Sequence, residues 1–278
     1  MTPDRTDILS WARDDFENRF GFPGAKHTRA NSIFCFLLAI ALTISFFGCL
    51  YFFNGSYIST MFTDRGPTPY FITLLSFWSL SIIWVKYSKL NLQRRALSLN
   101  IVPEKADFVL SPSTAEEILK KIRESVDDPK NFLVFNRIVI ALSNLQNLGR
   151  TSDVDDILRS QAEHEESSME TSYSLLRGFI WAIPVLGFIG TVLGLSQAIG
   201  GFSNVLADTE NIEEITMALQ IVTGGLATAF ETTLIALVAA LVLQLFVTFL
   251  KKNEEEFLDE CSEYCLSKIV NQLRMLPN

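Results

Sequence analysis

Four long stretches of this chain contain almost no Asp, Glu, Lys or Arg, at residues 33–53, 66–85, 178–207 and 215–250. Glu231 is the single exception. A helix rises about 1.5 Å per residue and needs ~20 apolar residues to cross the hydrocarbon core of a bilayer. Such runs do not fit an outer-membrane barrel, whose strands are about 10 residues of alternating polarity. The sequence predicts four transmembrane helices, at about 31–53, 70–85, 178–202 and 217–250.

The overall composition agrees with a membrane protein and excludes other classes. Of 278 residues, 49% are hydrophobic and 19% are charged, against about 25% charged in typical soluble proteins. The formal net charge of −8 is opposite to the clustered basic surface of nucleic-acid-binding proteins, so we expect no nucleic-acid partner. The first apolar run lacks a nearby small-residue cleavage site, which predicts a membrane anchor rather than a removed signal peptide.

The basic residues predict the orientation of the spans. The first 30 residues hold five Lys or Arg and residues 86–177 hold thirteen, whereas the loop 54–69 holds only Arg65. Because cytoplasmic segments carry the excess of Lys and Arg, both termini and the middle segment are expected in the cytoplasm. The predicted parts are a cytoplasmic N-terminal segment at 1–30, a transmembrane hairpin at 31–86, a cytoplasmic helical domain at 87–172, a transmembrane channel region at 173–250 and a cytoplasmic C-terminal helix at 251–278.

The predicted cytoplasmic domain reads as helices. One amphipathic run, with Ser113 as its cap, ends near Val126, and a second begins at Pro129 and stops at Gly149. A third, from about Ser152, is expected to continue unbroken into the third span. The fold class is therefore an all-α membrane protein with four transmembrane helices and a helical cytoplasmic domain.

The N-terminal stretch 6–20 also has a helical pattern. It places four apolar residues on one stripe: Ile8, Ala12, Phe16 and Phe20. Such a helix lies along the inner membrane surface or packs on the cytoplasmic domain, and the pattern leaves both open.

Residues with catalytic or metal-binding chemistry are sparse. His27 and His164 lie in polar segments without a Ser, Cys or Asp partner in a catalytic motif, and the sequence has no Gly-rich phosphate loop. The four cysteines have no histidine nearby, which favours small packed side chains over a zinc site. We therefore expect that the chain is not an enzyme and binds no metal or cofactor.

The third span carries several small residues and a proline. Gly187, Gly190 and Gly194 create a surface on which another helix can approach closely. Pro184 removes one backbone hydrogen bond and can kink the helix. The fourth span also has a small-residue surface.

Two threonines are expected at one depth in the membrane. Thr191 lies near the midpoint of the third charge-poor run and Thr233 near the midpoint of the fourth, which predicts both near mid-membrane. Each hydroxyl offers one donor and two acceptor lone pairs, which suit a partner carboxylate or an ion. The alternative is that each hydroxyl bonds only to its own helix.

Glu231 is the one ionisable residue of the fourth span. A charge near the bilayer centre costs about 3 kcal/mol or more, so such residues are usually paired or functional. It could face a pore, a basic residue of a neighbouring subunit or a partner protein. The alternative is a neutral Glu that is hydrogen-bonded within the helix bundle.

The motifs of these two spans are IPVLGFIGTVLG at 183–194 and AFETTL at 229–234. Together with the preceding extended helix and the short loop, they resemble the MotA/TolQ/ExbB proton channel family over about residues 150–260. The hairpin of the first two spans resembles the four-span MotA-like branch. One departure is visible: TolQ and ExbB carry a Glu about five residues before the fourth-span threonine, where this chain has Thr228.

The resemblance implies an assembly in the bacterial inner membrane. It implies a homopentamer around a dimer of a MotB-, TolR- or ExbD-like protein, which has one span with an essential Asp. It implies that translocated H⁺ or Na⁺ drives rotation, with no cofactor. By position, Pro184 matches the family's third-span proline, Thr191 its pore-facing position and Thr233 its fourth-span threonine. The expected contacts of the ion or of the partner carboxylate are Thr191, Thr228, Glu231, Thr232 and Thr233.

The sequence thus predicts an ion-channel subunit of an inner-membrane rotary motor, of flagellar, TolQ/ExbB or anti-phage Zorya type. The alternative is a structural membrane scaffold that conducts no ions. In that case the small residues and Glu231 serve oligomerisation only.

Overall fold

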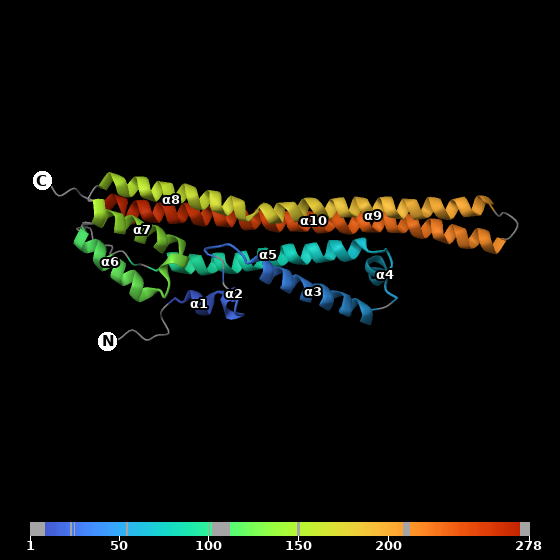
Figure 1. Ribbon diagram of the computed structural model, residues 1–278, viewed down its shortest axis with the longest axis horizontal. Helices are drawn as coiled ribbons and strands as arrows, with labels where there is room; N and C mark the ends of the chain where they lie inside the picture. The colour runs from blue at the N-terminus through green and yellow to red at the C-terminus, as the bar shows by residue number, and fades with distance from the viewer. Residues whose placement is uncertain are drawn as a thin grey trace. The chain divides into compact units, whose positions relative to one another are not determined.

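The structure is a computed structural model that describes residues 9–22, 24, 26–53, 55–99, 101, 112–148, 151–207 and 212–272. Within these residues the regular structure is helical, apart from an isolated bridge between Leu9 and Val126 (Figure 1). The α-helices are α1 (Trp11–Asp14), α2 (Phe16–Arg19), α3 (Ser32–Phe52), α4 (Tyr57–Thr63), α5 (Thr68–Leu97), α6 (Pro112–Ser125), α7 (Leu133–Leu148), α8 (Thr151–Ser172), α9 (Ser174–Ala207) and α10 (Ile212–Lys268). Two 3₁₀ turns are η1 (Pro129–Asn131) and η2 (Val270–Gln272).

The predicted all-α class with four spans is confirmed. Among the described residues, four helical stretches are long and apolar enough to cross a membrane: Ser32–Phe52, Thr68–Leu97, Val154–Gly201 and Ile215–Lys268. They correspond to α3, α5, α8 with α9, and α10. The expected span at 31–53 corresponds to α3, and the expected span at 70–85 lies inside α5. Helix α9 continues through Pro184 without interruption.

The chain forms two compact units. The first, which we call the membrane unit, comprises residues 32–83 and 174–248. The second, which we call the polar unit, comprises residues 1–31, 84–173 and 249–278 as far as they are described. Helices α5 and α10 each contribute residues to both units.

Aromatic side chains pack between helices of the membrane unit. Trp78 of α5 lies between Phe36 of α3 and Phe179 of α9, with ring centroids 4.6 Å apart in both pairs. Phe47 of α3 stacks on Tyr70 of α5 at 4.5 Å. Such rings bury large apolar areas and gain further from their offset and edge geometries. They join the first two spans to each other and to α9.

The polar unit has a core of α6, α7 and α8. Asp128 accepts a hydrogen bond from the backbone N–H of Lys130, which starts the turn that leads into α7. Phe132 and Phe135 then follow, fully buried against each other. This agrees with the helix expected from Pro129, whereas its expected stop, Gly149, lies outside the described residues.

Three local expectations differ from the structure. Helix α6 begins at Pro112, so Ser113 lies inside the first turn instead of capping it. Stretch 6–20 is not one helix: α1 and α2 are separated by the extended residue Asp15, and Ile8 lies outside the described residues. Trp11 of this stretch packs edge-on against Phe132, which supports packing on the helical domain over lying along a membrane.

The third helix continues into the third span, as expected, within one helical stretch at Val154–Gly201 that has a local irregularity at Tyr173. At this residue the Tyr173 N–H donates to the carbonyl of Glu170, three residues back. The hydroxyl of Ser172 likewise donates to the carbonyl of Met169. The junction of α8 and α9 is therefore one tightened turn.

Candidate functional site

The two predicted threonines meet between α9 and α10 in the membrane unit. The hydroxyl oxygens of Thr191 and Thr233 are in direct hydrogen-bond contact. Thr191 Oγ1 lies 3.1 Å from the carbonyl oxygen of Ala229 on α10, and Thr233 Oγ1 lies 3.1 Å from that of Gly187 on α9. The expectation that the two hydroxyls lie at one level is confirmed.

Protons are scarcer than acceptors in this cluster. Each hydroxyl is also near the carbonyl of its own helix four residues back, at 3.2 Å for Thr191 and 3.1 Å for Thr233. Two hydroxyl protons thus serve four carbonyl contacts and one hydroxyl–hydroxyl contact. The alternative of bonding only within each helix is therefore incomplete, because both threonines also bond across the helix pair. The hydroxyls can exchange partners without leaving the site.

The glycines of α9 make this contact sterically possible. A methyl group added to Gly187 would lie 2.5 Å from Cβ of Ala236, and one added to Gly194 would lie 2.5 Å from the backbone nitrogen of Ala229. Gly190 lies directly against the side chain of Thr232. Close backbone approach through small residues is how helices associate tightly in lipid. The glycine face of α9 therefore sets the distance between the two threonines.

The other two predicted threonines, Thr228 and Thr232, make no side-chain contact with Thr191 or Thr233 in the described hydrogen bonds, although the Thr232 hydroxyl also lies 3.4 Å from the carbonyl oxygen of Ala229. The hydroxyl of Thr232 is fully buried and donates to the carbonyl of Thr228 at 2.8 Å. The hydroxyl of Thr228 donates to the carbonyl of Gly224 at 3.0 Å. Both follow the usual back-bonding of helical threonines. Their predicted role in ion contact stays a prediction.

Glu231 has partners that sequence reasoning missed. Its carboxylate lies 2.7 Å from Nε of Arg65, in the connection between α4 and α5. The hydroxyl of Tyr57, at the start of α4, donates to the same carboxylate at 3.1 Å. The basic partner thus belongs to the same chain. Arg65 is the only basic residue of the loop 54–69, and this was the one feature of the sequence that could have indicated a partner for Glu231.

The depth predicted for the threonine pair in the membrane stays a prediction. Glu231 meets the α4–α5 connection, so Thr233, two residues further along α10, lies near that end of the α3–α5 hairpin.

A cavity of about 420 Å³ lies between α3, α4, α5 and α10 in the membrane unit. Its lining is apolar except for two hydroxyls, and those of Thr73 and Ser76 donate to carbonyls of their own helix at 2.7 Å. The lining residues are Phe46, Met61, Phe62, Ile72, Thr73, Ser76, Phe77, Leu234, Ile235, Val238 and Ala239. The lining side chains include no charged group.

Buried ion pairs hold the polar unit together. Lys86 Nζ lies 3.2 Å from Glu254, and both side chains are almost fully buried. The hydroxyls of Tyr173 and Thr28 donate to the same carboxylate, the former at 2.6 Å. A second buried lysine, Lys89, pairs with Glu17 of α2 in the same way.

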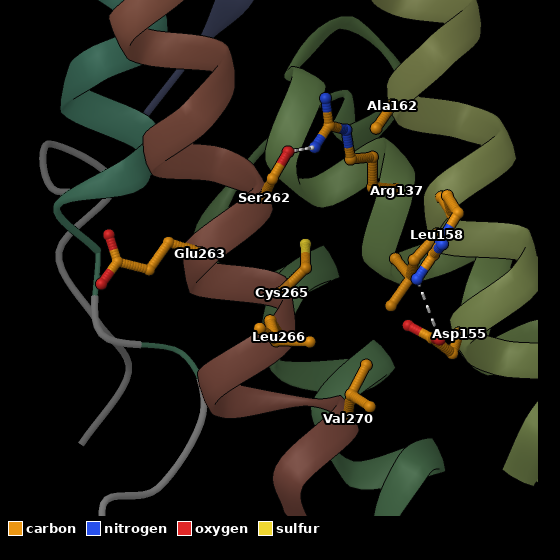
Figure 2. A pocket seen from close by; sticks show the side chains of 10 residues that line it. Arg137, Asp155, Leu158, Ala162, Ser262, Glu263, Cys265, Leu266 and Val270 are labelled. Atoms are coloured by element: carbon orange, nitrogen blue, oxygen red, sulfur yellow. Dashed lines mark hydrogen bonds and ion pairs between the residues drawn. The ribbon is translucent and has the colours of Figure 1, made fainter.

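A second cavity, of about 330 Å³, opens between α7, α8 and α10 in the polar unit (Figure 2). Arg137 lies at its inner end and donates to the hydroxyl of Ser262 at 2.9 Å. Its guanidinium also pairs with Glu165. Asp155 and Arg159 face each other at 3.8 Å along α8. The buried arginine thus already has Glu165 and Ser262 of its own chain as partners.

No metal centre is present in the described part of the chain, where no three His, Cys, Asp or Glu side chains converge. The comparison that bears on identity is with protein families. Residues 134–263, which include both threonines and the glycine face, match the model of the MotA/TolQ/ExbB proton channel family. That part of the chain is similar to this family. No curated protein and no solved structure matches the chain.

The similarity of residues 134–263 to the MotA/TolQ/ExbB family supports a function in general terms. Members of this family are channel and stator proteins rather than enzymes, and they work with single-span partner proteins. The family and the apolar helices together make this a membrane-embedded protein with a general channel or stator role.

Proposed function

We propose that this chain is the ion-channel subunit of a rotary motor in the bacterial inner membrane. In this proposal five copies surround a dimer of a single-span protein that carries a transmembrane Asp. Both termini lie in the cytoplasm. Proton-motive force, or sodium-motive force, turns one ring against the other, and the attached partner decides whether the motor is of flagellar, TolQ/ExbB or Zorya type.

The contact between Thr191 and Thr233 carries the proposal. A carboxylate cannot stay charged in hydrocarbon unless hydrogen bonds or an ion stabilise it. Two hydroxyls at one level, with acceptors to spare, can turn a proton toward such a carboxylate and back to a carbonyl. Protonation of the Asp, or binding of a cation, then releases one subunit and lets the next one bind.

A structural scaffold remains the second candidate, and the glycine face favours it. Close packing of α9 on α10 through Gly187 and Gly194 holds whether or not an ion passes. In a scaffold the threonine hydroxyls add only to helix packing. The two candidates therefore differ in what the loss of those hydroxyls does to ion flux.

The decisive experiment co-expresses the chain with a neighbouring single-span, Asp-bearing protein. Native mass spectrometry is expected to find five copies of this chain with two of the partner. In vesicles with a pH-sensitive dye, Thr191→Val and Thr233→Val are expected to lower proton flux about tenfold or more, because each loses a hydrogen bond to a charged group. Assembly should survive.

The matched control is Thr223→Val, which removes an exposed hydroxyl of α10 that donates to the carbonyls of Leu219 and Gln220 on its own helix. Its flux should equal that of the unmodified chain. Retained flux in both test variants would rule out the threonine mechanism. A monomer, or an even-numbered complex without partner, would favour the scaffold.

A further inference from the structure

Glu231 lies outside the threonine contact although it is only two residues from Thr233. Two residues turn a helix by about 200°, so the two side chains leave α10 on opposite sides. Thr233 points to α9, whereas Glu231 points to the α4–α5 connection. The Glu231 carboxylate is therefore not part of the Thr191–Thr233 contact, and its own partners indicate what it does.

The partners of Glu231 form a directed set of donors. Arg65 approaches with two nitrogens, Nε at 2.7 Å and Nη2 at 3.2 Å, and the hydroxyl of Tyr57 adds a third donor at 3.1 Å. The relative solvent exposure of the side chain is only 19% for Arg65 and 11% for Glu231. A planar guanidinium that meets both oxygens of a carboxylate fixes its orientation as well as its charge. We call this cluster of Tyr57, Arg65 and Glu231 the α4 clamp.

Local backbone geometry delivers Arg65 to α10. Helix α4 ends at Thr63, and the N–H of Asp64 closes its last turn by donating to the carbonyl of Thr60. Gly66 then takes a φ of +79°, which reverses the chain just before α5. Arg65 lies between the end of α4 and the start of α5, so the backbone on both sides of it is fixed.

Helix α4 also touches α10 through apolar side chains. Met61 and Phe62 pack against the buried cluster that contains Ile235, one turn beyond Glu231. Loss of the ion pair therefore leaves an apolar contact in place. Variants of the clamp should still fold, which makes the ionic part testable by itself.

We propose that Arg65 and Tyr57 are positioning residues: by holding Glu231 they fix the rotation of α10 about its axis, and so direct the Thr233 hydroxyl to Thr191. This inference rests on the proposed function, in which the threonine pair is the ion site. Both side chains belong to one helix, so a rotation that releases Glu231 turns Thr233 away from α9. Glu231 acts as an anchor here and carries no ion.

The first test uses the chain alone in lipid nanodiscs, with ¹³C-labelled threonine methyl groups observed by NMR. The Thr233→Val and Thr191→Val spectra assign the two signals. Glu231→Gln and Arg65→Glu are expected to shift both signals. Arg65→Lys, which keeps the charge and loses the planar fork, should shift them less. The charge-swapped variant Arg65→Glu/Glu231→Arg should return them toward their original positions.

The second test measures proton flux of the same variants assembled with the single-span partner. Glu231→Gln is expected to lower flux about tenfold to hundredfold, the range produced by a small misplacement of a reacting group. The charge swap should restore most of the flux. Recovery by the swap separates positioning from a role of Glu231 as an ion carrier, because the swap removes the carboxylate from α10.

The matched control is Glu256→Gln, which neutralises a half-exposed carboxylate on the same helix. It should change neither the methyl signals nor the flux. Unmoved threonine signals in Glu231→Gln overturn the positioning role, as does a swap that fails to restore them. A chain that conducts no protons in its unmodified form refutes the proposed function, and the methyl signals still decide whether the clamp sets α10.

Discussion

At the scale of single residues, burial shifts the pKa of Glu165 more than its ion-pair partner Arg137 does. Removal from water raises the pKa of this carboxyl to about 7, although Arg137 beside it acts in the opposite direction. The folded protein therefore keeps a proton on Glu165 at pH values where the unfolded chain has lost it. Linkage then requires that this group destabilises the fold as pH rises.

We predict that Glu165 lowers the free energy of unfolding by at most about 3 kcal/mol as pH rises from about 4.5 to 7. The thermal midpoint should fall over the same range. Below this window both states are protonated, and above it both are ionised. Glu165→Gln cannot titrate, so its midpoint should lose this part of the slope. Midpoints measured by tryptophan fluorescence between pH 4 and 8 check it. An unchanged slope in Glu165→Gln would contradict the assigned pKa.

His27 provides the opposing case in the same unit. Burial lowers the pKa of its imidazole to about 4, helped by the nearby charges of Lys26 and Arg29. Its contribution is present above pH 6.5 and is lost as pH falls toward 4, which is the reverse sign. His27→Asn tolerates the positive φ of 59° at this position and should flatten the acid side of the midpoint curve.

At the scale of secondary-structure elements, the pairing of α9 with α10 determines the site. The contact depends on the absence of a side chain at Gly194 of α9, because a methyl group added there would meet backbone atoms of α10. Backbone cannot turn aside as a flexible side chain can. Separation of the two helices at this point would also part Thr191 from Thr233.

We predict that Gly194→Ala destabilises the membrane unit by about 1–3 kcal/mol, as overpacking of a tight contact does. The matched control is Gly200→Ala on the same helix, where an added methyl meets nothing within 4 Å. That variant should be neutral or gain up to about 1 kcal/mol from helix propensity. Thermal midpoints in nanodiscs compare the two. Equal midpoints would show that α9 and α10 separate easily.

At the scale of the whole molecule, chain segments far apart in sequence meet around Glu254. Its carboxylate bonds Thr28 before the first span, Lys86 of α5 and Tyr173 at the junction of α8 and α9. The polar unit is therefore assembled from three separate pieces of chain and forms only when all are in place. Its integrity depends on a neutralised buried charge.

We predict that Glu254→Gln destabilises the polar unit by about 3–5 kcal/mol, because Lys86 is left buried without its counter-charge. Lys86→Met/Glu254→Leu removes both charges and should recover most of that loss. Hydrogen exchange of α6, α7 and α8 in the full chain reports the change. A double variant no more stable than Glu254→Gln would show that the hydrogen bonds of Tyr173 and Thr28 matter more than the charge pair.

The sequence predicted the spans and that Thr191 and Thr233 lie at one level, because hydropathy and helical rise depend on local residues alone. It could not supply the partners of Glu231 or of Lys86, because periodicity along one helix does not say which helix lies opposite. The basic residues were read as a signal of orientation, yet Lys86, Lys89 and Arg137 are buried in ion pairs. A count of charges does not reveal which of them are neutralised.

The hydroxyl cluster of Thr191 and Thr233 also has a consequence for electrical leakage. Both hydroxyl protons are used in hydrogen bonds within the helix pair. A subunit without a bound carboxylate therefore has no unpaired hydroxyl donor here that would attract water into the hydrocarbon. A file of water molecules is what would let protons slip past a resting complex. In the proposed ring, the subunits that are not engaged are therefore insulators, and ions move only where a carboxylate has opened the pair.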